Sequence, residues 1–197
     1  MIKIKTPIQI QFSLLISLMI FISCSNVTVE TGENFEVKEL PDGSIVYLNY
    51  NSYLEFDKAF DPRQIEINGE FYFSVVEGKS PFIINTELGE IKVIGTEFGV
   101  KTNNEKIEIE VEEGVVELNM EQYKNKVKRG ENAIYKKGEN AIRKGKAKFK
   151  FKIWMNNLKI EFKKLGREIK YNSKDFGKES KKVGKELKKE LKKLKIK

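Results

Sequence analysis

The chain contains no histidine and only one cysteine, Cys24. Histidine is the usual general base near neutral pH and the commonest metal ligand, so its absence excludes a Ser-His-Asp triad and a histidine-based zinc site. A single cysteine excludes an intramolecular disulfide and a thiolate metal cluster. We therefore expect no catalytic, cofactor-binding or metal-binding residues, and we expect that the protein is not an enzyme.

Negative and positive charges lie in separate parts of the chain. The 37 Lys and Arg residues outnumber the 29 Asp and Glu residues, which gives a net charge of +8. Residues 143–197 hold 22 basic and 6 acidic residues, or +16, so residues 1–142 hold 15 and 23, or −8. Opposite charge in two contiguous blocks indicates two physically different parts. The boundary between them falls near Arg143.

The chain begins with the pattern of a secretory signal peptide. Lys3 and Lys5 precede an uncharged run over residues 6–23, of which only residues 12–22 are strongly apolar. A helix that spans a membrane needs roughly 20 apolar residues, about twice the length of this apolar part. The run ends with a small residue directly before Cys24, and this arrangement resembles a bacterial lipobox.

We therefore predict that residues 1–23 are a lipoprotein-type signal peptide and that Cys24 is lipidated. The lipid would anchor the chain to a membrane. The alternative is an uncleaved anchor, because the 18 uncharged residues of 6–23 are just long enough to span a locally thinned bilayer. In both cases we expect a location in the cell envelope, with the rest of the chain facing the periplasm.

Residues 35–144 carry the pattern of short β-strands, after a predicted linker over residues 24–34. Apolar residues alternate with polar ones in short bursts, for example at Ile107 and Ile109, as is typical of half-buried strands. Turn signals such as Asp42-Gly43 separate the bursts. The pattern predicts an all-β domain of short strands, built as a roll or sandwich or as a β-solenoid-like stack.

Five sequence blocks follow one another in this region. They read LPDGS at 40–44, RQIEINGEFYFSV at 63–75, PFIINT at 81–86, VIGTEFGV at 93–100 and EGVV at 113–116. In this order the blocks resemble the FecR domain, which is the periplasmic domain of FecR-type regulators. The glycines within the blocks stand where tight turns or bulges disfavour a side chain, so we interpret the blocks as determinants of the fold.

The resemblance implies a role in signalling. FecR-type regulators carry a cytoplasmic anti-sigma segment, one transmembrane helix and a periplasmic domain that receives a signal from an outer-membrane transporter. Only a few residues precede the apolar run of this chain, so we expect no cytoplasmic anti-sigma segment. Direct control of a sigma factor is therefore not the function that we expect.

Two groups of side chains invite a functional interpretation, and for both we prefer a structural one. Phe71 and Phe73 flank Tyr72, and alternation places both phenylalanines on one face, which we predict to be core and not a stacking platform for bases or sugars. Three carboxylates lie on one face of one strand, whereas a glycosidase needs two acids facing each other across a cleft. We therefore predict that these carboxylates line a solvated edge of the sheet and are not a catalytic pair. They are Glu108, Glu110 and Glu112.

A tandem repeat closes the β-rich region. Residues 129–136 and 137–144 share the pattern Gly-Glu-Asn-Ala-Ile, which predicts two short strands joined by a Lys-Gly-Glu-Asn turn.

Residues 145–197 form a lysine-rich tail with helical periodicity. From Lys148 onward, apolar residues recur at steps of three, four or seven, which predicts a long basic amphipathic helix. Three interpretations remain open: the helix binds an anionic membrane surface or envelope polymer, it docks on the acidic β-domain or on a partner, or it is partly disordered. Nucleic acid would suit the charge alone, but export argues against it, so we expect no nucleic-acid partner.

Taken together, the sequence predicts a membrane-anchored, periplasm-facing FecR-like module that binds an envelope protein or polymer as a sensor, signalling or scaffold component. One alternative is a structural tether between envelope layers, held by the lipid on Cys24 and by the basic helix. The other is a signal-transduction regulator with an uncleaved N-terminal anchor.

Overall fold

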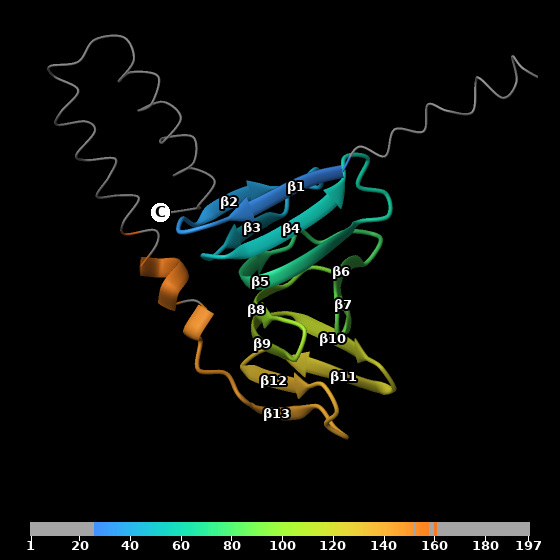
Figure 1. The fold of residues 1–197 in the computed structure, drawn as a ribbon. Coiled ribbons are helices and arrows are strands. Elements are labelled where there is room, and N and C mark those ends of the chain that lie inside the picture. Colours follow the sequence, from blue (N-terminus) through green and yellow to red (C-terminus); the bar gives the residue numbers. More distant parts are fainter. Residues whose placement is uncertain (1–25, 152, 158–159, 161–197) are drawn as a thin grey trace, which may run out of the picture.

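The computed structural model describes residues 26–151, 153–157 and 160 of the 197-residue chain. Thirteen strands make up most of this part (Figure 1). They are β1 (Asn26–Thr31), β2 (Glu36–Glu39), β3 (Ile45–Leu48), β4 (Ser52–Asp57), β5 (Gln64–Ser74), β6 (Phe82–Thr86), β7 (Gly89–Val93), β8 (Glu97–Thr102), β9 (Lys106–Glu113), β10 (Val115–Met120), β11 (Tyr123–Lys128), β12 (Glu131–Lys136) and β13 (Arg143–Lys146). The described part is therefore mostly β, as the sequence predicts.

The strands form two layers that share β5. Sheet A has the order β1-β4-β5-β6-β7-β10-β11, and sheet B has the order β2-β3-β5-β8-β9-β12-β13. The first half of β5 pairs within sheet A and the second half within sheet B, and the change occurs at Gly69. Gly69 has φ of +122°, and a Cβ at this position would lie 2.4 Å from Oγ of Ser52. Only glycine fits both the backbone conformation and this close approach.

The shared strand bends the two layers into a nearly closed, barrel-like sheet. Strand β11 at the edge of sheet A contacts β9 and β12 of sheet B, which brings the two ends of the sheet together. All strand pairs are antiparallel except β5 with β6. A solenoid stacks parallel strands, so the β-solenoid-like alternative is wrong for the described residues.

One hydrophobic core lies between the layers. The largest fully buried side chains include Phe71, Phe73, Phe82 and Phe98. The ring of Phe73 stacks on that of Phe98 with their centroids 5.1 Å apart. The prediction that Phe71 and Phe73 belong to the core is confirmed.

The folded domain begins before the predicted boundary. Strand β1 occupies residues 26–31, which the sequence analysis assigned to a linker over residues 24–34. It pairs with β4 along its whole length, and Val29 is buried in the core. The linker prediction is therefore wrong from Asn26 onward, because a short strand with only two apolar residues gives little periodic signal.

The tandem repeat folds as one strand and a turn, and not as two equal strands. Its first copy contains β12. The second copy is turn and bend from residue 137 to residue 142, and β13 begins only at Arg143. Strand β13 pairs with β12, so the copies are neighbours although they differ in conformation.

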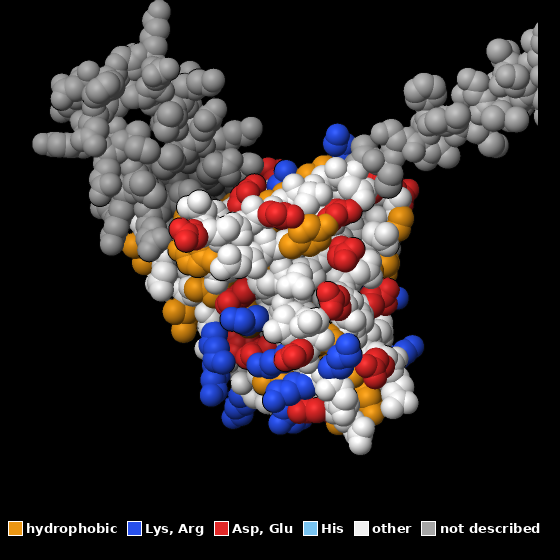
Figure 2. All heavy atoms as spheres, in the orientation of Figure 1, with side chains coloured by type: hydrophobic (Ala, Val, Ile, Leu, Met, Phe, Trp, Pro, Cys, Tyr) orange, Lys and Arg blue, Asp and Glu red, His pale blue; other side chains and the backbone are white. Residues whose placement is uncertain are grey.

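Only the beginning of the tail lies within the described residues. Residues 150, 151, 153–157 and 160 are helical, whereas the predicted signal peptide (residues 1–23), Cys24 and the tail from residue 161 lie outside the described residues. None of the described helical stretches is long and apolar enough to cross a membrane. Figure 2 shows Lys and Arg side chains gathered over the lower part of the domain, where Figure 1 places β12 and β13.

Candidate interaction surface on the outer face of sheet B

Sheet B has an outer face, opposite the core, that carries two rows of side chains across the strands. The first row runs through Tyr47, Tyr72, Gly99 and Glu110, which are direct cross-strand neighbours on β3, β5, β8 and β9. This row places two aromatic rings beside a glycine and a carboxylate. Cross-strand neighbours of this kind have side chains close enough to act together.

The start of the tail covers the first row. Phe151 and Met155 pack on Ile45, Tyr47 and Tyr72 in a second hydrophobic cluster. We call residues 148–151 and 153–157 the docked segment. Phe151 and Met155 are each only 4% exposed, so the tail begins as part of the domain surface.

Gly99 leaves the space for the Phe151 ring. A Cβ at position 99 would lie 2.0 Å from Cγ of Phe151, far closer than two carbon atoms can approach. Any side chain larger than hydrogen would displace the ring. Gly99, the second glycine of the motif VIGTEFGV, therefore has a packing role, which the sequence pattern alone does not reveal.

Glu110 holds the backbone of the docked segment. Its side chain accepts hydrogen bonds from the backbone N–H groups of Lys148 and Lys150, at 3.1 and 2.7 Å, and the residue is only 3% exposed. The N–H groups at the start of a helix have no partner within the helix. A carboxylate at this point satisfies two donors and interacts favourably with the positive end of the helix.

The prediction of a solvated sheet edge for Glu108, Glu110 and Glu112 is wrong. Strand β9 lies between β8 and β12, so it is an inner strand. Glu108 and Glu110 are buried, and the Tyr72 hydroxyl donates to Glu112 at 2.9 Å. These carboxylates alternate with apolar residues, as on a half-exposed strand, but here the docked segment covers the outer face of the strand.

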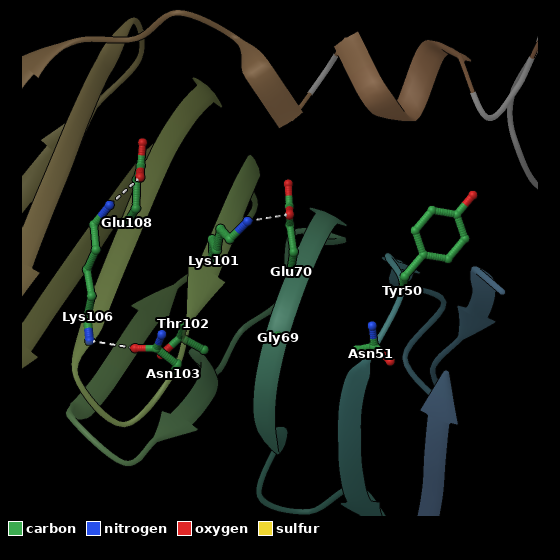
Figure 3. A pocket seen from close by; sticks show the side chains of 9 residues that line it. All are labelled: Tyr50, Asn51, Gly69, Glu70, Lys101, Thr102, Asn103, Lys106 and Glu108. Atoms are coloured by element: carbon green, nitrogen blue, oxygen red, sulfur yellow. Dashed lines mark hydrogen bonds and ion pairs between the residues drawn. The ribbon is translucent and has the colours of Figure 1, made fainter. Parts of the chain in front are cut away.

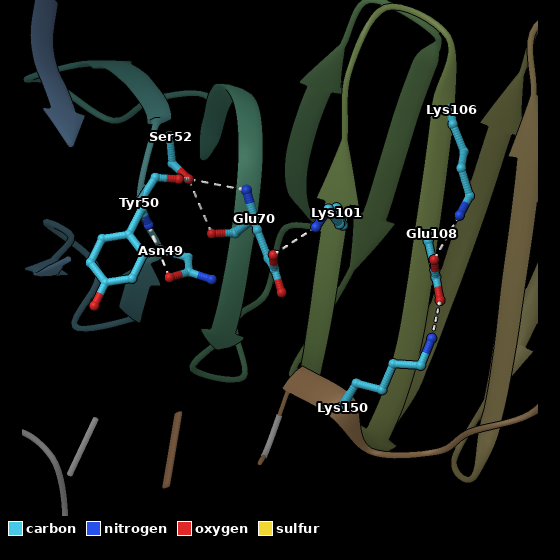
Figure 4. Close-up of polar contacts among 8 residues, drawn as sticks. All are labelled: Asn49, Tyr50, Ser52, Glu70, Lys101, Lys106, Glu108 and Lys150. Atoms are coloured by element: carbon cyan, nitrogen blue, oxygen red, sulfur yellow. Dashed lines mark hydrogen bonds and ion pairs between the residues drawn. The ribbon is translucent and has the colours of Figure 1, made fainter. Parts of the chain in front are cut away.

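The second row is a ladder of alternating charges. Glu70, Lys101 and Glu108 are cross-strand neighbours on β5, β8 and β9, and Lys101 contacts Glu70 at 3.0 Å (Figure 4). Glu108 contacts Lys106 at 2.8 Å and Lys150 of the docked segment at 3.5 Å. Burial opposes ionisation of Glu108, but hydrogen bonds and charge from these two lysines hold the pKa of its carboxyl below the usual value.

The same face raises the pKa of both tyrosines. Burial, with a smaller effect of Glu97, raises the pKa of Tyr47 to about 12. Burial also raises the pKa of Tyr72, and the nearby Glu112 and Glu97 add to the shift. Both hydroxyls are therefore neutral at physiological pH and serve as hydrogen-bonding groups on an apolar platform.

An open hollow of about 210 Å³ adjoins the charged row (Figure 3). Residues from the β3–β4 turn, β5, β8, the β8–β9 turn and β9 line it. They are Tyr50, Asn51, Gly69, Glu70, Lys101, Thr102, Asn103, Lys106 and Glu108. Tyr50 is half exposed at its margin. Both carboxylates of the lining are paired with lysines, so the hollow offers hydrogen-bonding and charged groups rather than a free acid–base pair.

Cys24, the predicted lipidation site, lies outside the described residues. Among the residues that the structure describes, no three His, Cys, Asp or Glu side chains are grouped in a way that could hold a metal ion. The sequence left docking on the β-domain as one of three options, because the periodicity of the tail shows that one side is apolar but not which surface that side contacts.

Comparison with known families assigns the β-domain. Residues 25–117 match the family model described as FecR protein. The match begins at β1 and ends within β10, so it includes Tyr47, Tyr72, Gly99 and Glu110. Strands β11–β13 and the docked segment follow the matched FecR residues.

Two crystal structures are similar to this chain. Both come from Parabacteroides distasonis, at 2.50 and 1.65 Å resolution, and both are described as a candidate anti-sigma factor. The sequence identities are 25% and 26%, and the TM-scores are 0.62 and 0.61. The similarity covers 66% of this chain but only 65% and 64% of the solved chains. None of the curated proteins is similar enough to count as a match.

Proposed function

We propose that this chain is an envelope-anchored FecR module that takes part in signalling by binding another envelope protein or polymer. The observation that carries the proposal is the FecR domain at residues 25–117, together with its similarity to structures described as candidate anti-sigma factors. The chain contains no histidine, and both carboxylates that line the hollow are paired with lysines, which is consistent with a binding role. Anti-sigma activity belongs to the description of those relatives and is not part of this proposal.

The hollow beside the charged row is the proposed contact surface. It combines a half-exposed tyrosine, Tyr50, with the amide side chains of Asn51 and Asn103 and with paired charges. Interfaces are enriched in tyrosine, and charged rims set the orientation of a partner. Strands of the barrel carry the paired charges of this surface, and the adjoining β3–β4 and β8–β9 turns carry Tyr50, Asn51 and Asn103.

Site-specific photocrosslinking in intact cells tests the proposal. A photoreactive residue at Tyr50 or Asn103 is expected to capture an envelope protein or glycan polymer. Gln122 is the matched control position, because it is exposed at the β10–β11 turn of sheet A. If no product forms from Tyr50 or Asn103, or if Gln122 gives the same product, the proposed contact surface is wrong.

The proposed anchor is a lipid on Cys24, with the folded domain in the periplasm. Labelled palmitate is expected to enter the wild-type chain but not Cys24→Ala, and the variant is expected to leave the membrane fraction. If the variant stays in the membrane and the wild type takes up no label, residues 6–23 act as an uncleaved anchor instead.

A structural tether is the second candidate, and the charge asymmetry favours it. An acidic domain with a strongly basic tail could link two envelope layers. Truncation after Ile160 tests this idea, because the truncated chain keeps β13 and the docked segment and loses the rest of the basic tail. Loss of envelope integrity in cells that carry this truncated chain, while the crosslinks from Tyr50 persist, would identify a tether.

A further inference from the structure

The docked segment and its flanking residues have two apolar faces. Phe151 and Met155 face sheet B and are buried. Phe149, Ile153 and Ile160 are 39%, 59% and 50% exposed. They account for three of the seven exposed large hydrophobic side chains among the described residues. The tail thus leaves a second set of apolar side chains uncovered after it has docked.

Helical spacing places two of these residues along one side. Ile160 follows Ile153 by seven residues, or about two helical turns, so both project from the same side of a helix. Phe149 lies directly before the helical residues with φ of +52°, and its carbonyl oxygen accepts the N–H of Ile153 at 3.1 Å, so it adjoins the first turn. An apolar stripe of this kind, next to a face already buried against the domain, faces away from sheet B.

Lysines close in sequence to these residues indicate the surface that the stripe suits. Lys148, Lys150, Lys152 and Lys159 lie within the same stretch of sequence, and the whole part from residue 143 carries 22 basic and 6 acidic residues. A helix with an apolar stripe between lysines lies in the interface of a bilayer, where anionic headgroups attract the lysines. An acidic protein surface would also attract the lysines. Insertion among acyl chains removes more of the exposed aliphatic surface from water than contact with a charged protein surface does, so it is more favourable in free energy.

We propose that the outward face formed by Phe149, Ile153 and Ile160 rests on the anionic surface of a membrane while Phe151 and Met155 remain on sheet B. This inference extends the proposed function, because it assumes that the chain acts at the envelope. The docked segment then lies between the acidic domain and the anionic bilayer. It fixes the orientation of the domain, with sheet B toward the membrane, where a lipid anchor alone would leave the domain free to rotate.

Quenching of Trp154, which is the only tryptophan in the chain, tests this orientation. The full chain is reconstituted into phosphatidylcholine vesicles with or without phosphatidylglycerol, and with lipids brominated close to the headgroup. Trp154 is partly buried beside the second hydrophobic cluster and directly follows Ile153 in the helix. Bromines near the headgroups are therefore expected to quench its emission in the anionic vesicles and much less in the neutral ones. Lysines beyond Ile160 could bring the chain to the vesicles, but they would not bring Trp154 within reach of the bromines.

Substitutions on the outward face give the matched comparison. The double variant Ile153→Gln, Ile160→Gln is expected to bind anionic vesicles with an affinity lower by about tenfold or more, because it removes two apolar side chains from the interface. Most of the quenching should be lost with it. Ile94→Gln is the control, because Ile94 is 57% exposed on the domain itself. Absence of quenching in anionic vesicles, or equal quenching in the double variant, would overturn the proposal.

The proposed function and this inference can fail separately. Crosslinks from Tyr50 without quenching of Trp154 would retain the binding module and reject the membrane-facing tail. Quenching of Trp154 without crosslinks from Tyr50 would retain the membrane-facing tail and reject the proposed contact surface.

Discussion

At position 99, the missing side chain makes room for the Phe151 ring. This is a constraint of packing and not of backbone conformation, since a Cβ would lie 2.0 Å from Cγ of Phe151. Overpacking of this kind typically costs 1 to 3 kcal/mol or displaces the neighbour. Because Phe151 belongs to the tail, we expect the tail to move before the sheet does.

Gly99→Ala is therefore predicted to release the docked segment and leave the β-domain folded. The docking free energy should fall by roughly 1–3 kcal/mol. Trp154 emission would shift to longer wavelength as the side chain becomes exposed to water, while the far-ultraviolet circular dichroism stays unchanged.

Gly32→Ala is the control for this substitution. No atom would lie within 4 Å of a Cβ at Gly32, so this variant should keep the wild-type emission. An unshifted spectrum for Gly99→Ala would show that the Phe151 contact does not hold the tail.

Removal of the Glu110 carboxylate is expected to loosen the docked segment. Glu110→Ala leaves two backbone N–H groups without an acceptor in a buried place, and each such loss costs about 1–3 kcal/mol. We expect faster proteolysis after Lys148 and Lys150 in this variant, measured by limited trypsin digestion. Glu87→Ala removes an exposed carboxylate and should leave the digestion pattern unchanged.

Single residues also show where sequence reasoning succeeds and fails. Phe71 and Phe73 could be assigned to the core because alternation on one strand is a local property. Glu110 could not be placed, because its burial depends on a segment 38 residues away in the sequence. A carboxylate between apolar residues has the same pattern whether the outer face of its strand meets water or another segment.

At the scale of elements, strand β9 joins the core to the tail. Its inward side chains belong to the main core, and Glu108 and Glu110 on the other face meet the docked segment. The sequence predicted the strand and its alternation correctly. It placed the strand at a solvated edge because the neighbours of a strand depend on topology, which a single sequence does not specify.

The ion pairs of Glu108 predict that docking weakens in acid. The pKa of Glu108 lies below its usual value of 4.5 in the folded chain. Lys106 of the domain lowers it most, and Lys150 of the docked segment adds a smaller effect. The stabilisation of docking by Lys150 is therefore present above pH 4.5 and is lost as the pH falls through the folded pKa. We expect the red shift of Trp154 emission to begin below about pH 4.5.

Glu108→Gln separates this effect from general acid unfolding. The variant should show weaker docking at neutral pH and a smaller change between pH 6 and the acid range, because the titrating group is gone. An acid response identical to that of the wild type would mean that other carboxylates control the docking.

At the scale of the whole molecule, the β-domain and the start of the tail form one surface. The domain is acidic and the tail basic, and the described contacts between them are apolar at Phe151 and Met155 and polar at Glu108 and Glu110. The sequence indicated the charge asymmetry and left docking as one of three options. Docking is observed for the described start of the tail, whereas membrane binding is the inference drawn for its outward face.

Hydrogen exchange of the full chain tests the docking of this surface most directly. The amide protons of Lys148 and Lys150, donated to the buried Glu110 side chain, are predicted to exchange slowly, as do those of inner strands such as β9. Glu110→Ala should restore fast exchange at both amides and leave β9 protected. Fast exchange at Lys148 and Lys150 in the wild-type chain would contradict the account, because the tail would then not be part of the domain surface.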